Sequence, residues 1–179
     1  MKVEPMSLSN IKNAIRNVPD FPQKGIQFKD ITTALKQPDV FKEILERLAT
    51  EYKGKKIDYV AGIESRGFIF GSALAYFLGC GFIPIRKKGK LPAEVLRQEY
   101  VLEYGTDIIE MHKDALCKDD NVLIVDDLLA TGGTTEAAAK LVLQSGANIT
   151  GFAFVIDLTD LGGRKKLLPY APVFSLIEY

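Results

Sequence analysis

Residues 122–135, Val122-Leu-Ile-Val-Asp-Asp-Leu-Leu-Ala-Thr-Gly-Gly-Thr-Thr135, decide the fold class of this chain. Residues 122–125 are apolar and mostly β-branched, which is typical of a strand buried on both faces. Two aspartates and a loop of small residues follow, and residues 134–143 then have the character of a helix. A buried strand that leads through a glycine loop into a helix predicts an α/β protein.

The same segment carries two kinds of chemistry. Gly132 and Gly133 let the backbone approach an oxyanion closely, and loop N–H groups at a helix N-terminus favour negative charge. This arrangement suits a phosphate monoester. Asp126 and Asp127 would repel that phosphate, so we expect them to face hydroxyl groups or a metal-bound sugar beside it. Capping and turn formation explain each residue singly, but they explain poorly why two acids end a core strand.

Outward from this segment, strands and helices alternate. The pattern predicts a first helix with its N-cap at Ser9, a loop over 19–30, a mobile polar loop over 88–98, and an irregular or edge strand at Pro84. Alternating strands and helices predict a mainly parallel twisted sheet flanked by helices, with ligands at the carboxyl ends of the strands. The remaining helices are expected over 38–52 and 67–78, and the remaining strands over 57–63, 82–85, 99–104, 107–111, 152–156 and 173–177.

Composition excludes several classes of protein. The 179 residues are 47% hydrophobic and 26% charged, as in ordinary globular domains, and no repeat or linker divides them. Positive and negative side chains balance to a net charge of zero, so no nucleic acid is expected as a partner. No apolar run has the length of a membrane span or signal peptide. Cys80 and Cys117 are expected to be free thiols in the cytoplasm, and His112 to be structural.

Two further stretches are suited to anions. Gly62-Ile-Glu-Ser-Arg-Gly67 is a strand-to-helix turn, although it is not a complete Walker A loop. Arg86-Lys-Lys-Gly-Lys90 adds four cations in five positions, which alone would indicate a solvated loop. Beside two phosphate-type turns it becomes a plausible clamp for a polyanion. Two anion sites with sugar-facing acids between them describe a sugar that carries phosphates at both ends.

In these stretches the chain resembles the type I phosphoribosyltransferases, whose signature for phosphoribosyl diphosphate (PRPP) is similar to residues 122–135. Four more stretches narrow the resemblance to the branch of the family that acts on adenine. They are Asp20-Phe-Pro-x-x-Gly25 with Phe28-Lys-Asp-Ile31, Gly62-Ile-Glu-Ser-Arg-Gly-Phe68, Arg86-Lys-Lys-Gly-Lys-Leu-Pro92 and Leu102-Glu-Tyr-Gly105.

The resemblance implies one domain over residues 1–179 with a type I phosphoribosyltransferase fold. Residues 1–35 would form an N-terminal helix and a small hood over the base, and residues 36–179 the core that binds PRPP, with a flexible loop. The implied reaction belongs to purine salvage: Mg²⁺-dependent transfer of 5-phosphoribose from PRPP to adenine, which yields AMP and pyrophosphate. The family also implies a homodimer.

Site roles carry over from the family residue by residue. Glu103 would be the catalytic group facing N7 of the base, and Mg²⁺ would be held through PRPP and water rather than by side chains. Phe28 and Leu128 would sandwich the adenine, with the backbone near Gln27 and Lys29 reading its edge. Asp126 and Asp127 would hold the ribose hydroxyls. The 5-phosphate would be cradled by Ala130, Thr131, Gly132, Gly133 and Thr134, and the pyrophosphate by Glu64, Ser65, Arg66, Lys87, Lys90 and Tyr104.

The chain departs from the family at two positions, and two other functions stay open. Lys29 stands where the family commonly has Arg, so a bidentate contact would be lost, and Lys24 stands where it commonly has Pro. A regulator that senses purines or PRPP is disfavoured because one domain accounts for the chain and because Glu103 and the loop lysines are present. A hypoxanthine/guanine or xanthine enzyme is disfavoured by the matches at residues 102–105 and in the N-terminal loop.

Overall fold

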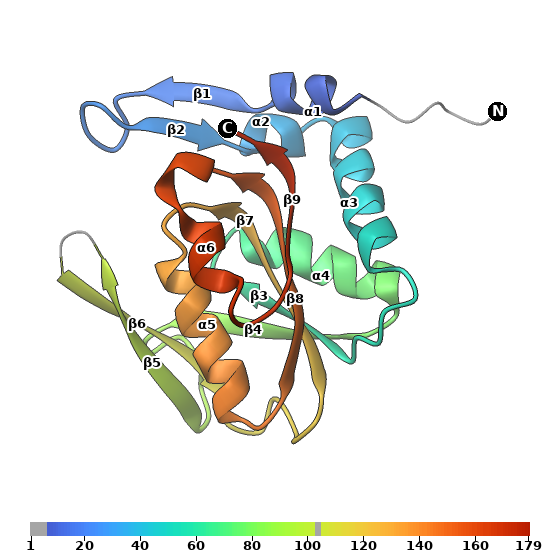
Figure 1. Cartoon of the computed structure of the whole chain (residues 1–179), viewed down its shortest axis with the longest axis vertical. Coiled ribbons are helices and arrows are strands. Elements are labelled where there is room, and N and C mark those ends of the chain that lie inside the picture. Colours follow the sequence, from blue (N-terminus) through green and yellow to red (C-terminus); the bar gives the residue numbers. More distant parts are fainter. Residues whose placement is uncertain (1–6, 103–104) are drawn as a thin grey trace.

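The computed structural model describes residues 7–102 and 105–179, which contain a seven-stranded sheet (Figure 1). Its strands are β3 (Tyr59–Ile63), β4 (Gly81–Lys87), β5 (Val95–Leu102), β6 (Gly105–His112), β7 (Asn121–Leu129), β8 (Asn148–Asp157) and β9 (Val173–Glu178). Their order across the sheet is β5-β6-β4-β3-β7-β8-β9. Five neighbouring strands are parallel to one another: β4, β3, β7, β8 and β9. Strand β6 runs antiparallel to both of its neighbours, β5 and β4. The predicted fold class, a mainly parallel sheet flanked by helices, is confirmed.

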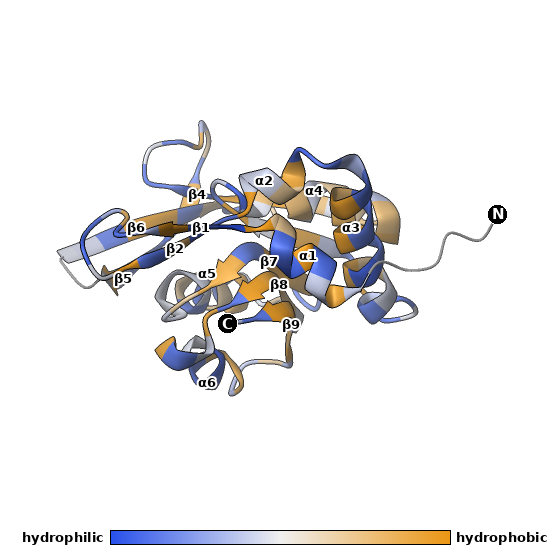
Figure 2. Ribbon diagram, turned by 90° about the horizontal axis from the view of Figure 1, so that it is seen from above, coloured by the Kyte–Doolittle hydropathy of each residue, from blue (hydrophilic) through white to orange (hydrophobic). Residues whose placement is uncertain are grey.

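Helices cover both faces of the sheet (Figure 2). Along β7, Leu123 and Val125 pack into one apolar cluster while Val122 and Ile124 pack into the other, because successive side chains of a strand point to opposite faces. The residues 122–125 are therefore buried on both sides, as their composition predicts. The first cluster lies under α1 (Leu8–Ala14), α2 (Thr32–Leu35), α3 (Pro38–Tyr52) and α4 (Gly67–Leu78), and the second under α5 (Gly133–Gln144) and α6 (Gly163–Leu167).

The N-terminal part differs from the local pattern. The first helix is capped by Ser7 rather than Ser9 and ends at Ala14, and Val18 lies in a strand, β1 (Arg16–Pro19). The predicted loop over 19–30 contains a second strand, β2 (Gln27–Asp30), which pairs antiparallel with β1 so that Val18 lies opposite Phe28. The helical spacing of Ile11, Ala14, Ile15 and Val18 therefore predicted a helix that is too long. Local spacing could not reveal the hairpin, because the hairpin depends on pairing between residues about ten positions apart. This hairpin lies above the main sheet (Figure 1).

Two further predictions need correction, whereas the prediction for Pro84 does not. The polar segment 88–98 is a loop only as far as Glu94, because β5 begins at Val95 and pairs along its whole length with β6. Pro84 fits its predicted irregular or edge position: it pairs with β3 on one side, and the pairing of β4 with β6 on the other side starts only at Arg86. Strand β7 continues to Leu129, so the two aspartates lie within the strand instead of following it.

Candidate active site

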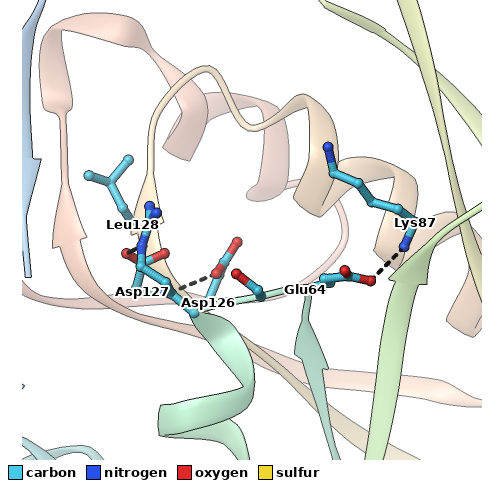
Figure 3. A pocket seen from close by; sticks show the side chains of 7 residues that line it. Glu64, Lys87, Asp126, Asp127 and Leu128 are labelled. Carbon is cyan, nitrogen blue, oxygen red and sulfur yellow. Dashed lines mark hydrogen bonds and ion pairs between the residues drawn. The ribbon is translucent and has the colours of Figure 1, made fainter. Parts of the chain in front are cut away.

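A cavity of about 280 Å³ opens where β3, β4 and β7 end (Figure 3). Strand β3 lies between the other two, and all three are parallel, so their carboxyl ends meet at one edge of the sheet. The cavity therefore gathers side chains that are far apart in the sequence. It is lined by Glu64, Ser65, Arg66, Lys87, Asp126, Asp127 and Leu128, all of which were predicted as site residues.

The two aspartates of β7 have different surroundings. Asp127 is buried, with 3% of its surface exposed, and its Oδ2 accepts a hydrogen bond from Nε of Arg66 at 2.5 Å. Asp126 Oδ1 accepts from the backbone N–H of Asp127 at 2.8 Å. Removal of the Asp126 carboxyl from water, reinforced by the neighbouring Asp127, raises its pKa well above the usual range. Burial would lower the pKa of Arg66, but the Asp127 carboxylate more than offsets this and raises it.

On the predicted pyrophosphate side of the cavity, Arg86 and Lys87 are paired with carboxylates. Glu64 Oε2 accepts from Arg86 Nε at 3.1 Å and from the backbone N–H of Lys87 at 3.0 Å. The Lys87 ammonium lies 3.3 Å from Asp107 Oδ2. Lys90 is exposed and lies outside the cavity lining, although its carbonyl accepts from Arg86 at 3.1 Å. An incoming pyrophosphate would have to compete with these carboxylates.

Glu110 supports the turn that carries Lys87 and Lys90, and sequence reasoning missed it. Its carboxylate is 1% exposed and accepts from the Gly89 backbone N–H at 2.8 Å and from Arg97 Nε at 2.7 Å. Burial alone would raise the pKa of Glu110, but these donors more than offset it and lower the pKa. In the sequence Glu110 is one acid in an alternating strand, and only its position opposite Arg97 in the β5–β6 pair reveals the contact.

The predicted 5-phosphate loop, residues 130–134, connects β7 to α5 beside the cavity but does not line it. Gly132 has φ +77°, a left-handed conformation that glycine adopts without a steric penalty. Among the described residues, no side chain caps the N-terminus of α5, so an anion there would meet free N–H groups. Gly163 packs directly on this loop: a methyl group in place of its hydrogen would lie 2.2 Å from the Ala130 carbonyl oxygen. Sequence reasoning did not single out Gly163.

On the predicted adenine side, the residues of β2 alternate between two faces. The Phe28 ring centroid lies 5.7 Å from Cζ of Arg66, which lines the cavity. Gln27 and Lys29 instead meet Asn17, whose amide donates to Gln27 Oε1 at 2.7 Å and whose Oδ1 accepts from Lys29 Nζ at 3.1 Å. Their side chains thus face away from Phe28, because neighbouring side chains of a strand point to opposite faces.

The remaining predicted residues, Glu103 and Tyr104, lie outside the described residues. They connect β5 to β6 in the chain. None of the helices within residues 7–102 and 105–179 is long and apolar enough to cross a membrane.

The two predicted anion-binding turns follow the neighbouring strands β3 and β7, and the carboxylates of Asp126 and Asp127 lie beside them, an arrangement that fits a sugar phosphate. The family model described as phosphoribosyl transferase domain matches residues 30–178. The adenine phosphoribosyltransferase of Brucella anthropi is 53% identical over 96% of this chain and 95% of that protein, and the one from Brucella ovis is 54% identical over 94% of each.

Solved structures agree with these relatives. The adenine phosphoribosyltransferase of Thermoanaerobacter pseudethanolicus has a TM-score of 0.94 and 54% identity, covering 97% of this chain and all of that one (100%). The Saccharomyces cerevisiae enzyme, complexed with an imino-altritol bisphosphate and adenine, has a TM-score of 0.89 and 44% identity over 95% and 98% of the two chains. This chain belongs to the phosphoribosyl transferase family and, within it, to the adenine phosphoribosyltransferases.

Proposed function

We propose that this chain transfers 5-phosphoribose from Mg²⁺-bound PRPP to adenine in the cavity between β3, β4 and β7, yielding AMP and pyrophosphate for purine salvage. One observation carries the proposal. The cavity brings Arg66 and Lys87 together with the Asp126–Asp127 pair, directly beside the loop 130–134. Cations, sugar-facing acids and a phosphate loop are the groups that a ribose with phosphates at both ends requires. The yeast enzyme, which binds a bisphosphate and adenine, supports the same pair of ligands here.

Each end of PRPP would have its own subsite. Residues 130–134 would take the 5-phosphate on backbone N–H groups, and Asp126 and Asp127 would accept hydrogen bonds from the ribose hydroxyls. Residues 64–66, with Lys87, Lys90 and Tyr104, would take the pyrophosphate. Pyrophosphate leaves C1′ with its bonding electrons, so positive charge develops on the ribose ring. Fixed cations at the leaving group and fixed positions for both reactants lower the barrier of this step.

The carboxylates of the cavity fit a Mg²⁺ ion that arrives with PRPP better than one held by the protein. Mg²⁺ prefers carboxylate, phosphate and water oxygens in an octahedron. The carboxylates of Glu64, Asp126 and Asp127 already accept protein hydrogen bonds. Within the described residues, no three His, Cys, Asp or Glu side chains gather as a protein-held metal would need. Bound through PRPP and water, the ion would neutralise charge on the departing pyrophosphate.

Adenine would stack between Phe28 and Leu128, and Glu103 would accept the proton from N7 as N9 attacks C1′. In reverse, Glu103 would return this proton to N7 of AMP. A positioned acid–base group contributes on the order of 10²–10⁴ in rate. We therefore expect Glu103→Leu to lower kcat more than Glu103→Gln does, with little change in PRPP binding. If the kcat of Glu103→Leu stays within roughly threefold of the parent kcat, the loss is far smaller than that range, and this role is excluded.

The proposed enzyme is a homodimer, and helix α4 offers the surface for it. This helix starts directly after Arg66, and its outward side carries Ile69, Tyr76 and Phe77, with Tyr76 86% exposed. Large exposed apolar side chains grouped on one helix are typical of an interface. Sedimentation of the parent should give a dimer, and Tyr76→Asp should shift it toward monomers; a monomeric parent would contradict the proposal.

The reaction itself is tested by supplying PRPP, Mg²⁺ and one base at a time: adenine, hypoxanthine, guanine or xanthine. We expect AMP and pyrophosphate from adenine and little turnover with the other three. Faster turnover of hypoxanthine or guanine would assign the chain to another base. Binding of PRPP without turnover of any base would favour a regulator.

A further inference from the structure

Tyr179, which follows β9, lies between two lysines of the N-terminal part. The ammonium of Lys29 in β2 is 4.1 Å from the centroid of the Tyr179 ring, and that of Lys12 in α1 is 4.3 Å from it. Both distances are within the range of cation–π attraction. One ring of the core thus contacts both the helix and the hairpin of the N-terminal part.

The core holds the backbone of Tyr179 in place independently of these lysines. Its backbone N–H donates to the Asp157 carbonyl at 3.0 Å, and its carbonyl accepts from the Thr159 backbone N–H at 3.0 Å and the Thr159 hydroxyl at 2.8 Å. The Tyr179 hydroxyl donates to the Lys12 carbonyl at 3.3 Å, and Lys12 Nζ donates to the Glu178 carbonyl at 2.6 Å. The ring is therefore a fixed point against which the N-terminal part is placed.

The contact with Lys29 bears on the adenine side of the site. Lys29 is adjacent to Phe28 in β2, and neighbouring side chains of a strand point to opposite faces. When Tyr179 and Asn17 hold Lys29 on the outer face, Phe28 must point toward Arg66 and the cavity, as it does. We infer that Tyr179 is a positioning residue for adenine: by fixing Lys29, it sets the orientation of Phe28 and of the backbone at residues 27–29. This inference rests on the proposed function.

Loss of this contact should loosen β2 without unfolding the chain. Ile11, Ile15 and Ile31 of the N-terminal part are almost fully buried in the core cluster that also contains Ile44 and Phe70. These apolar contacts hold the helices of the N-terminal part whether or not Tyr179 is present. The effect of a substitution at Tyr179 should thus be local to the hairpin.

The test combines steady-state kinetics with hydrogen exchange. In Tyr179→Leu we expect the KM for adenine to rise about fivefold, the loss expected from a cation–π contact, while the KM for PRPP stays unchanged. Amide exchange in the peptide covering residues 26–31 should become faster, and exchange in residues 38–52 of α3 should not. Tyr179→Phe keeps the ring and is the matched control, which should stay within about twofold of the parent because a cation–π contact needs only the ring.

Lys29→Met tests the same contact from the other side and does not depend on the folding of the Tyr179 variants. It should raise the KM for adenine to a similar extent, and the double variant should be no worse than either single one. Unchanged adenine KM and unchanged exchange in Tyr179→Leu would overturn the inference, as would an equal rise in both KM values. If the parent itself makes no AMP, the proposed function fails, whereas the exchange measurement still decides whether Tyr179 fixes β2.

Discussion

The proposed 5-phosphate loop and the proposed pyrophosphate side of the cavity are held in place by different forces. The loop over residues 130–134 is fixed by backbone packing: Gly132 adopts a left-handed conformation, and Gly163 lies so close to Ala130 that no side chain fits between them. The pyrophosphate side is held by ion pairs: Arg66 with Asp127, Arg86 with Glu64, and Lys87 with Asp107.

This difference predicts different responses to substrate. Steric packing leaves the 5-phosphate loop preorganised, so binding there costs little rearrangement. Arg66, Arg86 and Lys87 on the other side already have carboxylate partners, and a pyrophosphate must displace or share them. Substitutions that disturb the packing of residues 130–134 should therefore damage the geometry of the loop severely. Substitutions in the ion pairs should instead change the balance of charge in the cavity.

The largest effect is expected from Gly163→Ala. The added methyl group would overlap the Ala130 carbonyl and push the 5-phosphate loop out of position, and a displacement of about 1 Å in such a site costs on the order of 10²-fold in rate. We expect kcat/KM for PRPP to fall to that extent. Gly162→Ala is the control: an added methyl there meets no atom within 4 Å, so its φ of +71° should cost stability, about 1–2 kcal/mol, without displacing the loop. Equal kinetics for the two variants would show that the loop is not held by this contact.

A smaller change of opposite sign is expected from Asp107→Asn. This substitution removes the carboxylate that competes with pyrophosphate for Lys87, and Asn keeps an oxygen that can accept from Tyr100, whose hydroxyl lies 3.3 Å from Asp107. The KM for PRPP should fall about two- to fivefold, as expected for a partly exposed ion pair. The gain should shrink at high salt. A rise in KM would mean that Asp107 positions Lys87 rather than competes for it.

The smallest effect concerns stability and the Asp126 carboxyl. Its pKa in the folded chain is raised above the ordinary 3.8 by burial and by Asp127, so ionisation destabilises the fold increasingly as pH rises from that value toward the folded pKa. Asp126→Asn should raise Tm at pH 7 by about 2–4 °C, which corresponds to ~1 kcal/mol for a chain of this size. Near pH 4 this gain should vanish. The exposed Asp114, changed to Asn, is the control and should show no such gain at either pH.

Much of the core was predictable because its signals are local. The run at 122–125, the helix start at Pro38 and the helix over 67–78 all depend on composition and periodicity within one element. The comparisons confirm the predicted family and, with it, the reaction class. The predicted cavity residues also come together, because a parallel order of strands places the ends of β3, β4 and β7 at one edge.

What the sequence did not reveal depends on contacts between distant residues. The hairpin of β1 and β2 arises from pairing across a proline-containing turn, and Val18 follows a helical spacing although it lies in a strand. Glu110 acquires its role only through its position opposite Arg97. Gly163 looks like any turn glycine until it is seen against Ala130, more than thirty positions earlier in the chain.

A crystal structure of the chain with PRPP, Mg²⁺ and an unreactive adenine analogue tests the central claim most directly. We predict the 5-phosphate on the backbone of residues 130–134, the pyrophosphate against Ser65 and Arg66, and the base against Phe28. Density for PRPP away from the cavity of β3, β4 and β7, or in the reverse orientation with its pyrophosphate on residues 130–134, would contradict the account.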